Sequence, residues 1–158
     1  MTKSIENPPA LSLHDYLPYR LVVASNQVSR VVARAYQTRF GLTVWEWRVI
    51  ALLGEAEPMT AQALSDIAAM DKVSVSRAVK SLVDRELVVR AERETDRRSR
   101  DLRLTASGRA LYRKIMPVAL GAEADLLGGL DAAEVATLVR LLEVVRCRAA
   151  ELLAAETD

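Results

Sequence analysis

The spacing of apolar residues changes twice along the chain, from helical to alternating and back to helical. Steps of three and four residues between Asp15 and Phe40 predict one long amphipathic helix. Alternation at 87–94 and 100–104 instead predicts the two strands of a hairpin. Helical spacing elsewhere predicts further helices at 44–53, 61–70, 73–85, 105–127 and 131–153.

Short capping motifs mark where these helices begin and end. Thr43 and Glu46 have the spacing of a capping box, in which each side chain bonds the other residue's backbone amide. Asp131 and Glu134 form the aspartate variant of this motif before the last helix. Gly41 ends the first helix. The residues predicted to cap the third and fifth helices are Thr60 and Thr105.

The order of these elements predicts a mainly α-helical fold with a small β-hairpin. Two short helices joined by a tight turn and followed by a hairpin are typical of a winged helix-turn-helix. A lone hairpin is only marginally stable in water, so this one must pack against the preceding helices. We predict a single domain over 1–158, with a winged helix-turn-helix core at 43–104 and helical regions at 12–40 and 105–155.

The composition argues against an enzyme, a metal site and a membrane protein. With one cysteine and one histidine in 158 residues, the chain cannot build a disulfide framework or a cysteine metal cluster. It also has no glycine-rich phosphate loop and no nucleophile motif, so we expect neither catalysis nor a cofactor. No stretch reads as a signal peptide or a membrane span, and we expect a cytoplasmic protein.

Positive charge is concentrated in one region of a chain whose net charge is only +1. Residues 72–103 hold ten basic and six acidic side chains, which gives +4, whereas the remaining twelve basic and fifteen acidic side chains give −3. This distribution is typical of a surface that binds a polyanion, although charged runs are also common on solvated faces.

The helix at 73–85 presents a chemically distinct outer face. Val75, Val79 and Leu82 share one side of the helix at 100° per residue. Small hydroxyls and long cations share the other side, and the candidates there for contacts to DNA are Ser74, Ser76, Arg77 and Lys80. Serines can approach phosphates or base edges, arginine can bind guanine bidentately and lysine can reach phosphates. An ordinary surface helix with a polar outer face is the alternative.

The tip of the predicted hairpin carries several arginines. We predict that these residues reach the minor groove beside the helix, where arginine responds to groove width and negative potential. Asp96 is predicted to orient Arg98, two residues away. The DNA-contact candidates at the tip are Asp96, Arg97, Arg98 and Arg100. A solvated turn with weak local ion pairs is the alternative.

Residues 96–108 match D-x-R-x-x-x-L-x-L-T-x-x-G, which resembles the wing signature of the MarR family of bacterial transcription regulators. Residues 42–53 and 74–88 are similar to that family's second helix and recognition helix. The resemblance implies a DNA-binding regulator, most often a repressor, that binds a pseudo-palindromic operator as a homodimer. The chain departs from the pattern at Glu86, where the family usually has glycine.

The resemblance also implies roles for the terminal helices and a small-molecule effector. The regions 12–40 and 105–155 would form the dimer, which would account for the many apolar residues late in the chain; a monomeric helical cap is the alternative. Relatives often bind an aromatic acid, a phenol or a related thioester in a cleft between the dimer helices and the DNA-binding core. The candidates for this cleft are His14, Tyr16, Tyr19, Arg20, Tyr36, Trp45 and Arg48.

Two further expectations concern function. Cys147 lies late in the last helix, whereas peroxide-sensing relatives use a cysteine near the first helix, so we expect a buried structural thiol and no redox switch. A winged-helix protein-interaction module that does not bind DNA is the alternative function. The joint presence of Arg77, Lys80 and Arg98 argues against that module.

Overall fold

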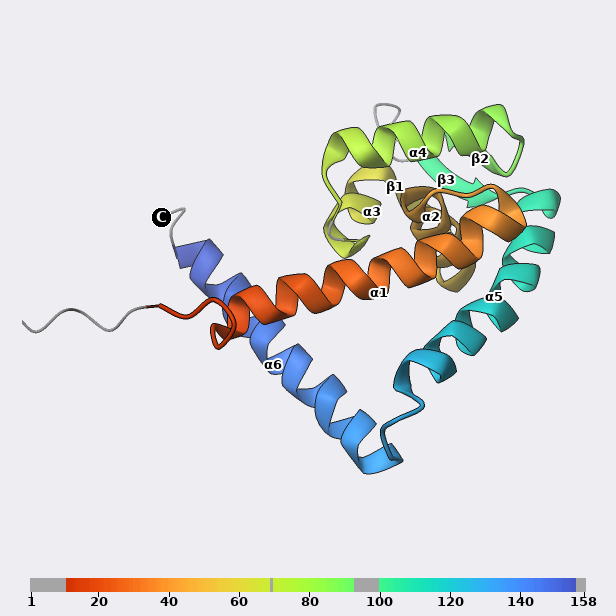
Figure 1. The fold of residues 1–158 in the computed structure, drawn as a ribbon. Coiled ribbons are helices and arrows are strands. Elements are labelled where there is room, and N and C mark those ends of the chain that lie inside the picture. Colours follow the sequence, from red (N-terminus) through yellow and green to blue (C-terminus); the bar gives the residue numbers. More distant parts are fainter. Residues whose placement is uncertain (1–10, 69, 93–99, 156–158) are drawn as a thin grey trace, which may run out of the picture. The chain divides into compact units, whose positions relative to one another are not determined.

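The computed structural model describes residues 11–68, 70–92 and 100–155. Its elements follow one another along the chain as shown in Figure 1. They are α1 (Leu17–Phe40), α2 (Val44–Glu55), β1 (Met59–Thr60), α3 (Ala61–Ala68), α4 (Lys72–Asp84), β2 (Val88–Glu92), β3 (Arg100–Leu104), α5 (Ala106–Leu127) and α6 (Ala132–Ala155). The chain divides into two compact units, Met1–Ala119 and Leu120–Asp158. A mainly helical fold with a small antiparallel sheet confirms the predicted fold class.

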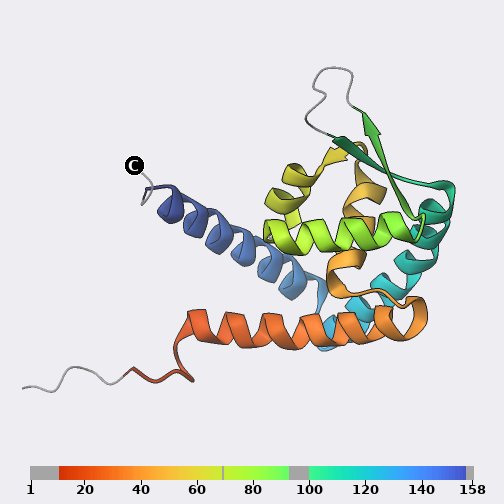
Figure 2. The same cartoon turned by 90° about the horizontal axis from the view of Figure 1, so that it is seen from above.

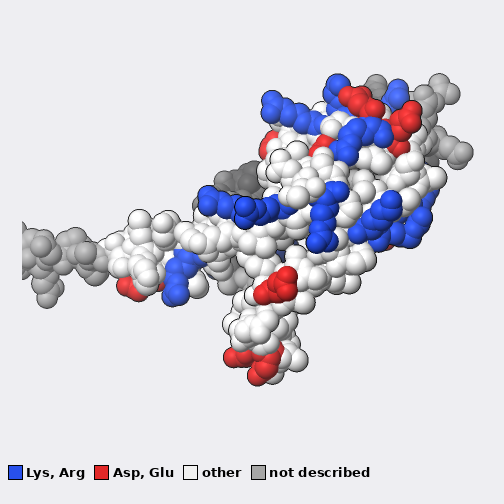
Figure 3. All heavy atoms as spheres, turned by 45° about the vertical axis from the view of Figure 1, so that its right-hand side comes forward, with Lys and Arg blue, Asp and Glu red and all other residues white. Residues whose placement is uncertain are grey.

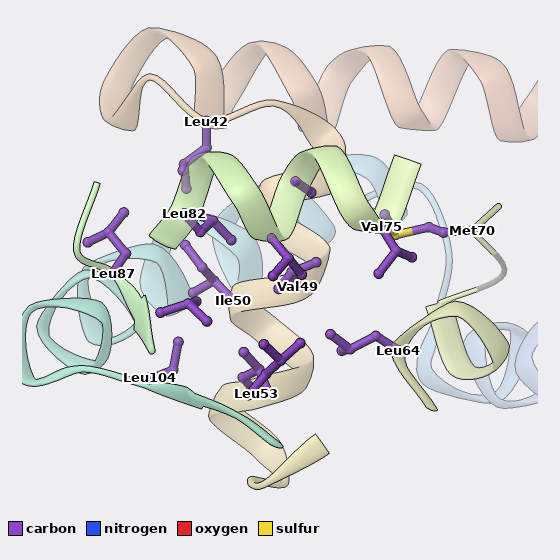
Figure 4. Packing of buried hydrophobic residues seen from close by; sticks show 14 of the residues in the cluster. Leu42, Val49, Ile50, Leu53, Leu64, Met70, Val75, Leu82, Leu87 and Leu104 are labelled. Atoms are coloured by element: carbon purple, nitrogen blue, oxygen red, sulfur yellow. The ribbon is translucent and has the colours of Figure 1, made fainter. Parts of the chain in front are cut away.

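The first unit contains a three-helix core and the wing. Helices α2, α3 and α4 pack on one another, and their buried leucine and valine side chains point into a shared interior (Figure 4). Leu42, Ile50, Leu64 and Leu82 in this interior are completely buried. Figure 2 shows the two longer strands lying side by side next to α4. The winged helix-turn-helix arrangement is therefore built on one continuous apolar core.

The sheet has a third strand that the sequence pattern did not predict. Its order is β1-β3-β2, and both pairings are antiparallel. Strand β1 pairs Met59 with Leu102 and Thr60 with Asp101. Two residues are too few to show alternation, so β1 was indistinguishable from a loop. Its pairing gives β3 a neighbour on each side and fixes the base of the wing.

The predicted helix caps are confirmed. Gly41 adopts a left-handed φ of 60° at the end of α1. Thr43 and Glu46 form both bonds of the capping box before α2. The hydroxyl of Thr60 accepts a hydrogen bond from the amide of Ala63 at 3.1 Å. Equivalent bonds to Thr105 and Asp131 start the last two helices.

The first turn of α5 lies directly on the start of β2. The amide of Thr105 donates to the carbonyl of Leu87 at 3.1 Å, and the Thr105 hydroxyl donates to the carbonyl of Glu86 at 2.7 Å. A Cβ added to Gly108 would overlap the Leu87 carbonyl. This close approach is the physical reason for a glycine at the last position of the wing motif.

Helix α6, in the second unit, has no buried residue in the single chain. Its apolar residues Leu138, Leu141 and Val145 are exposed. Cys147 is also exposed, so the expectation of a buried thiol is wrong for the single chain. A hydrogen bond to Glu143 raises the pKa of the Cys147 thiol. In the described part of the chain, no helix is both long and apolar enough to cross a membrane.

Glu86 occupies a strained backbone position at the end of α4. Its φ is 55°, a left-handed conformation that costs a non-glycine residue about 1 kcal/mol. We predict that Glu86→Gly raises the free energy of unfolding by about 0.5–1 kcal/mol, because glycine lacks the Cβ that clashes there. Glu86→Ala keeps the Cβ and should bring no such gain. Chemical denaturation of both variants tests this, and equal effects would contradict it.

Candidate nucleic-acid interface

Helix α4 has the two faces that its sequence predicted. The carboxylate of Asp71 accepts the amide of Ser74 at 2.9 Å and so caps the helix. Val75, Ala78, Val79 and Leu82 are buried against the core. Ser76, Arg77 and Lys80 are exposed on the opposite side. The exposed residues therefore form a polar and cationic ridge on a helix whose back is fixed by packing.

The predicted side chains on α4 differ in how free they are to contact DNA. The hydroxyl of Ser74 donates to Asp71 at 2.6 Å, and the hydrogen bonds from Ser74 lower the pKa of that carboxyl. Ser74 thus stabilises the start of the helix. Lys80 lies 2.7 Å from Asp84, but both side chains are exposed and such a pair contributes little. Among the described residues, Arg77 makes no ion pair.

A groove of about 430 Å³ lies between α4 and the wing. We call it the wing groove. Its polar and charged lining residues are Thr60, Gln62, Lys72, Ser76, Arg90 and Arg100. Within the described ranges, Lys72, Arg90 and Arg100 have no acidic partner. The wing groove is therefore lined by three basic side chains that form no ion pair with any described residue.

A second groove, of about 320 Å³, lies on the other side of α4 where α2 begins. We call it the α2 groove. Its lining residues are Thr43, Trp45, Glu46, Ser74, Arg77, Ala78 and Ser81. Figure 3 shows that basic side chains are spread widely over one face of the molecule, while acidic ones gather in fewer places. Broad positive charge alone therefore does not mark a site, and the two grooves beside α4 are the more specific feature.

The buried carboxylate of Glu46 fixes α4 against α2. Glu46 is 5% exposed, and its oxygens accept hydrogen bonds from the amide of Thr43 at 2.7 Å and the hydroxyl of Ser81 at 2.5 Å. The guanidinium of Arg85 lies 3.7 Å from the same carboxylate. Arg85 also donates to the carbonyls of Phe40 and Gly41 at 3.3 and 3.2 Å. One acidic side chain thus links the start of α2, the helix α4 and the end of α1.

Glu57 has a similar role at the base of the wing. Its carboxylate accepts the amide of Leu104 at 2.7 Å and forms an ion pair with Arg109. These contacts join the segment before β1 to the end of β3 and the first turn of α5. Sequence reasoning missed Glu57, because its partners lie 47 and more residues away and no local motif marks it.

Of the predicted wing-tip residues, the structure describes Arg100, which lines the wing groove. Asp96, Arg97 and Arg98 lie outside the described residues. Among the described residues, no group of three or more histidine, cysteine, aspartate or glutamate side chains could hold a metal ion.

Comparisons with known proteins place this geometry in a family. The model of the MarR family matches residues 40–99, from the end of α1 into the wing. The HTH-type transcriptional regulator TcaR of Staphylococcus aureus (strain Newman) is 23% identical over 125 residues, 78% of this chain and 82% of TcaR. The crystal structure of a MarR/EmrR family transcriptional regulator from Acinetobacter sp. ADP1 superposes with a TM-score of 0.83 at 28% identity, over 89% of this chain and 99% of that one.

The chain belongs to the MarR family. It is a MarR-family transcriptional regulator with a winged-helix fold. A third comparison, with Bordetella bronchiseptica BpsR, gives a TM-score of 0.79 at 23% identity over 87% of this chain and 97% of BpsR. That structure describes the regulation of BpsR DNA binding by 6-hydroxynicotinic acid.

The effector candidates of this MarR-family chain lie in three different places. His14, Tyr19 and Arg20 share a shallow pocket of about 280 Å³ at the start of α1, and Tyr16 is exposed beside them in sequence. Tyr36 is 1% exposed and stacks on Trp47 with a centroid distance of 4.5 Å, which places it in the core. Trp45 and Arg48 lie on α2, where Trp45 lines the α2 groove.

The Glu46 network predicts how the stability of this MarR-family chain depends on pH. Burial raises the pKa of Glu46, but hydrogen bonds from Ser81 and Thr43 and the charge of Arg85 outweigh it and lower the pKa below its usual 4.5. A lowered folded-state pKa means that the carboxylate stabilises the fold above about pH 4.5 and that this stabilisation is lost as pH falls through the lowered pKa.

We therefore predict that Glu46→Gln lowers the free energy of unfolding by about 2 kcal/mol at pH 7, a typical value for hydrogen bonds to a charged group. The difference from the wild type should shrink as pH falls below about 4.5, because the carboxyl of the unfolded chain protonates there while the folded one protonates only at its lowered pKa. Denaturant titrations between pH 7 and pH 3 test this. Glu55→Gln, at the exposed end of α2, is the control and should show no such difference. A constant difference across the range would contradict the assignment.

Proposed function

We propose that this regulator acts as a homodimer that binds duplex DNA with α4 in the major groove, and that an aromatic effector releases it. The observation that carries this proposal is the exposed ridge of α4 with the cationic wing groove beside it. A helix with its side chains is about 10–12 Å across and fits a major groove about 12 Å wide. Ser76 and Arg77 lie toward the N-terminal half of the ridge, the part that usually meets base edges.

The wing groove supports a contact to the phosphate backbone. Lys72, Arg90 and Arg100 come from α4, β2 and β3 and surround one space of about 430 Å³. Cations without acidic partners gain by replacing the counterions of a phosphate chain. We also propose that Asp96, Arg97 and Arg98 extend this surface over the adjacent minor groove. The winged helix-turn-helix core at 43–104 would then supply the whole DNA-binding surface.

The exposed apolar residues of α6 support a homodimer. A helix of 24 residues with no buried side chain in the single chain requires a partner to cover its apolar face. We propose that regions 12–40 and 105–155 of two chains provide that cover. A two-fold dimer presents two recognition helices and suits a pseudo-palindromic site with half-sites about one helical turn apart. The protein would act in the cytoplasm, as a regulator without catalytic activity.

DNA binding can be tested with the tightest duplex selected from a random-sequence pool. We predict that Arg77→Ala weakens binding about tenfold or more, since a bidentate arginine–guanine contact contributes about 1–3 kcal/mol. Arg90→Ala and Arg100→Ala should weaken binding to every sequence. They should also reduce the steepness of the plot of log binding constant against log salt concentration, by about 0.9 for each phosphate that is no longer neutralised. Light scattering should find two chains on each duplex.

Arg113→Ala, an exposed arginine of α5, is the charge-matched control and should bind normally. Wild-type affinity in all three test variants would refute the assigned roles. If the wild-type chain does not bind duplex DNA at low salt, the alternative function, a protein-interaction module, is favoured instead.

An aromatic acid is the effector class that the comparisons and the α1 pocket support. BpsR responds to 6-hydroxynicotinic acid. In this chain, Tyr19 and Arg20 could stack on a ring and pair with a carboxylate, and His14 lines the same pocket. We propose this pocket as part of the effector site. The other half would come from the partner chain in the dimer, since the pocket is shallow by itself.

We predict that 6-hydroxynicotinic acid, 4-hydroxybenzoic acid or the coenzyme A thioester of the latter raises the melting temperature and weakens DNA binding. A ligand at one hundred times its Kd stabilises the native state by about 2.7 kcal/mol. Arg20→Ala should abolish the shift, whereas Arg30→Ala, elsewhere on α1, should keep it. A shift that survives Arg20→Ala would exclude this pocket.

A further inference from the structure

A helix lying in the major groove is bordered by both phosphodiester backbones, one on each side. On α4 the wing groove supplies cations for one of these borders. The α2 groove lies at the opposite border, where α2 begins, and none of its lining residues comes from the described part of the wing. The residues of that second border determine whether α4 is held on one side or on both.

The α2 groove has an aromatic and cationic lining. Trp45 is 39% exposed, which is unusual for a side chain of this size on a folded domain. The guanidinium of Arg48 lies 5.4 Å from the centroid of the Trp45 ring, within the range of a cation–π contact. Arg77 lines the same groove from α4. Neither arginine forms an ion pair with any described residue.

The carboxylate in this groove does not oppose an anion strongly. Glu46 is 5% exposed, and its oxygens are occupied by Thr43 and Ser81. Arg85, 3.7 Å away, compensates its charge. The solvent-facing part of the groove is therefore formed by Trp45, Arg77 and uncharged side chains.

We infer that Trp45 and Arg48 bind the phosphodiester backbone on the α2 side of α4, so that the two strands of the duplex are held by different parts of the unit. This inference rests on the proposed DNA binding and extends its surface to α2. A guanidinium binds phosphate oxygens bidentately, and stacking on the indole holds its plane in position. The indole N–H is a further donor, and its ring can lie against the sugar. Both residues were predicted to line the effector cleft, and the structure favours a DNA contact for them instead.

The first test measures the salt dependence of binding to a mixed-sequence 30-base-pair duplex and to the selected duplex. Arg48→Ala should weaken binding to both about fivefold for each bound chain, without changing the preference between them. The log–log slope with salt should fall by about 0.9 for each chain. Arg113→Ala, with the same loss of charge on α5, should leave affinity and slope unchanged.

The second test uses Trp45 as the probe and does not depend on a destabilising change at the interface. The chain has two tryptophans, so Trp47→Phe leaves Trp45 as the sole indole. Quenching of its fluorescence by acrylamide should fall about twofold when the mixed-sequence duplex is added, because the ring becomes covered. In the reciprocal variant, Trp45→Phe, quenching of the half-buried Trp47 should not change.

The outcomes separate this inference from the proposed function. If Arg77→Ala and Arg90→Ala weaken binding while Arg48→Ala does not, the inference is overturned and DNA binding stands. Unchanged quenching of Trp45 on a duplex that the protein binds overturns it as well. Protection of Trp45 by 6-hydroxynicotinic acid but not by DNA would assign the groove to the effector. A wild-type chain that binds no duplex would overturn both proposals.

Discussion

The buried carboxylate of Glu46 is the interaction on which the placement of the recognition helix depends. A buried carboxylate is costly unless hydrogen bonds and opposite charge compensate it, and both kinds of partner are present here. Ser81 belongs to α4 and Arg85 is its C-cap, while Thr43 precedes α2. The Glu46 carboxylate therefore contacts all three partners in one relative placement of the two helices. The close-packed apolar core supplies most of the free energy, and this fully satisfied polar network adds a directional constraint to it.

The two grooves beside α4 follow from this placement and from the anchoring of the wing. Glu57 bonds the end of β3 and pairs with Arg109, while β1 pairs with the other edge of β3. The wing therefore has a fixed base, from which Arg90 and Arg100 reach the space beside Ser76. On the far side, the capping box that starts α2 also positions Trp45. The short segment that caps the start of α2 therefore also forms one border of the candidate interface.

Features encoded by neighbouring residues were predictable from the sequence, and features that join distant segments were not. The cap pairs lie three residues apart, so spacing alone identifies them. The bond between Ser81 and Glu46 spans 35 residues and that from Leu104 to Glu57 spans 47, and neither leaves a local pattern. Tyr36 shows the same limit for the candidate site, because an aromatic side chain serves a core or a cleft equally well until its burial is known.

The contact between Gly108 and the Leu87 carbonyl has a mechanical consequence. Side chains that separate two elements can change rotamer and absorb a small displacement, but here main chain meets main chain with no side chain between them. A rotation of the first turn of α5 must therefore move the start of β2 by a comparable amount. Because only three residues, 85–87, separate the C-terminal end of α4 from β2, these main-chain contacts tie the start of α5 to the end of the helix that carries Arg77.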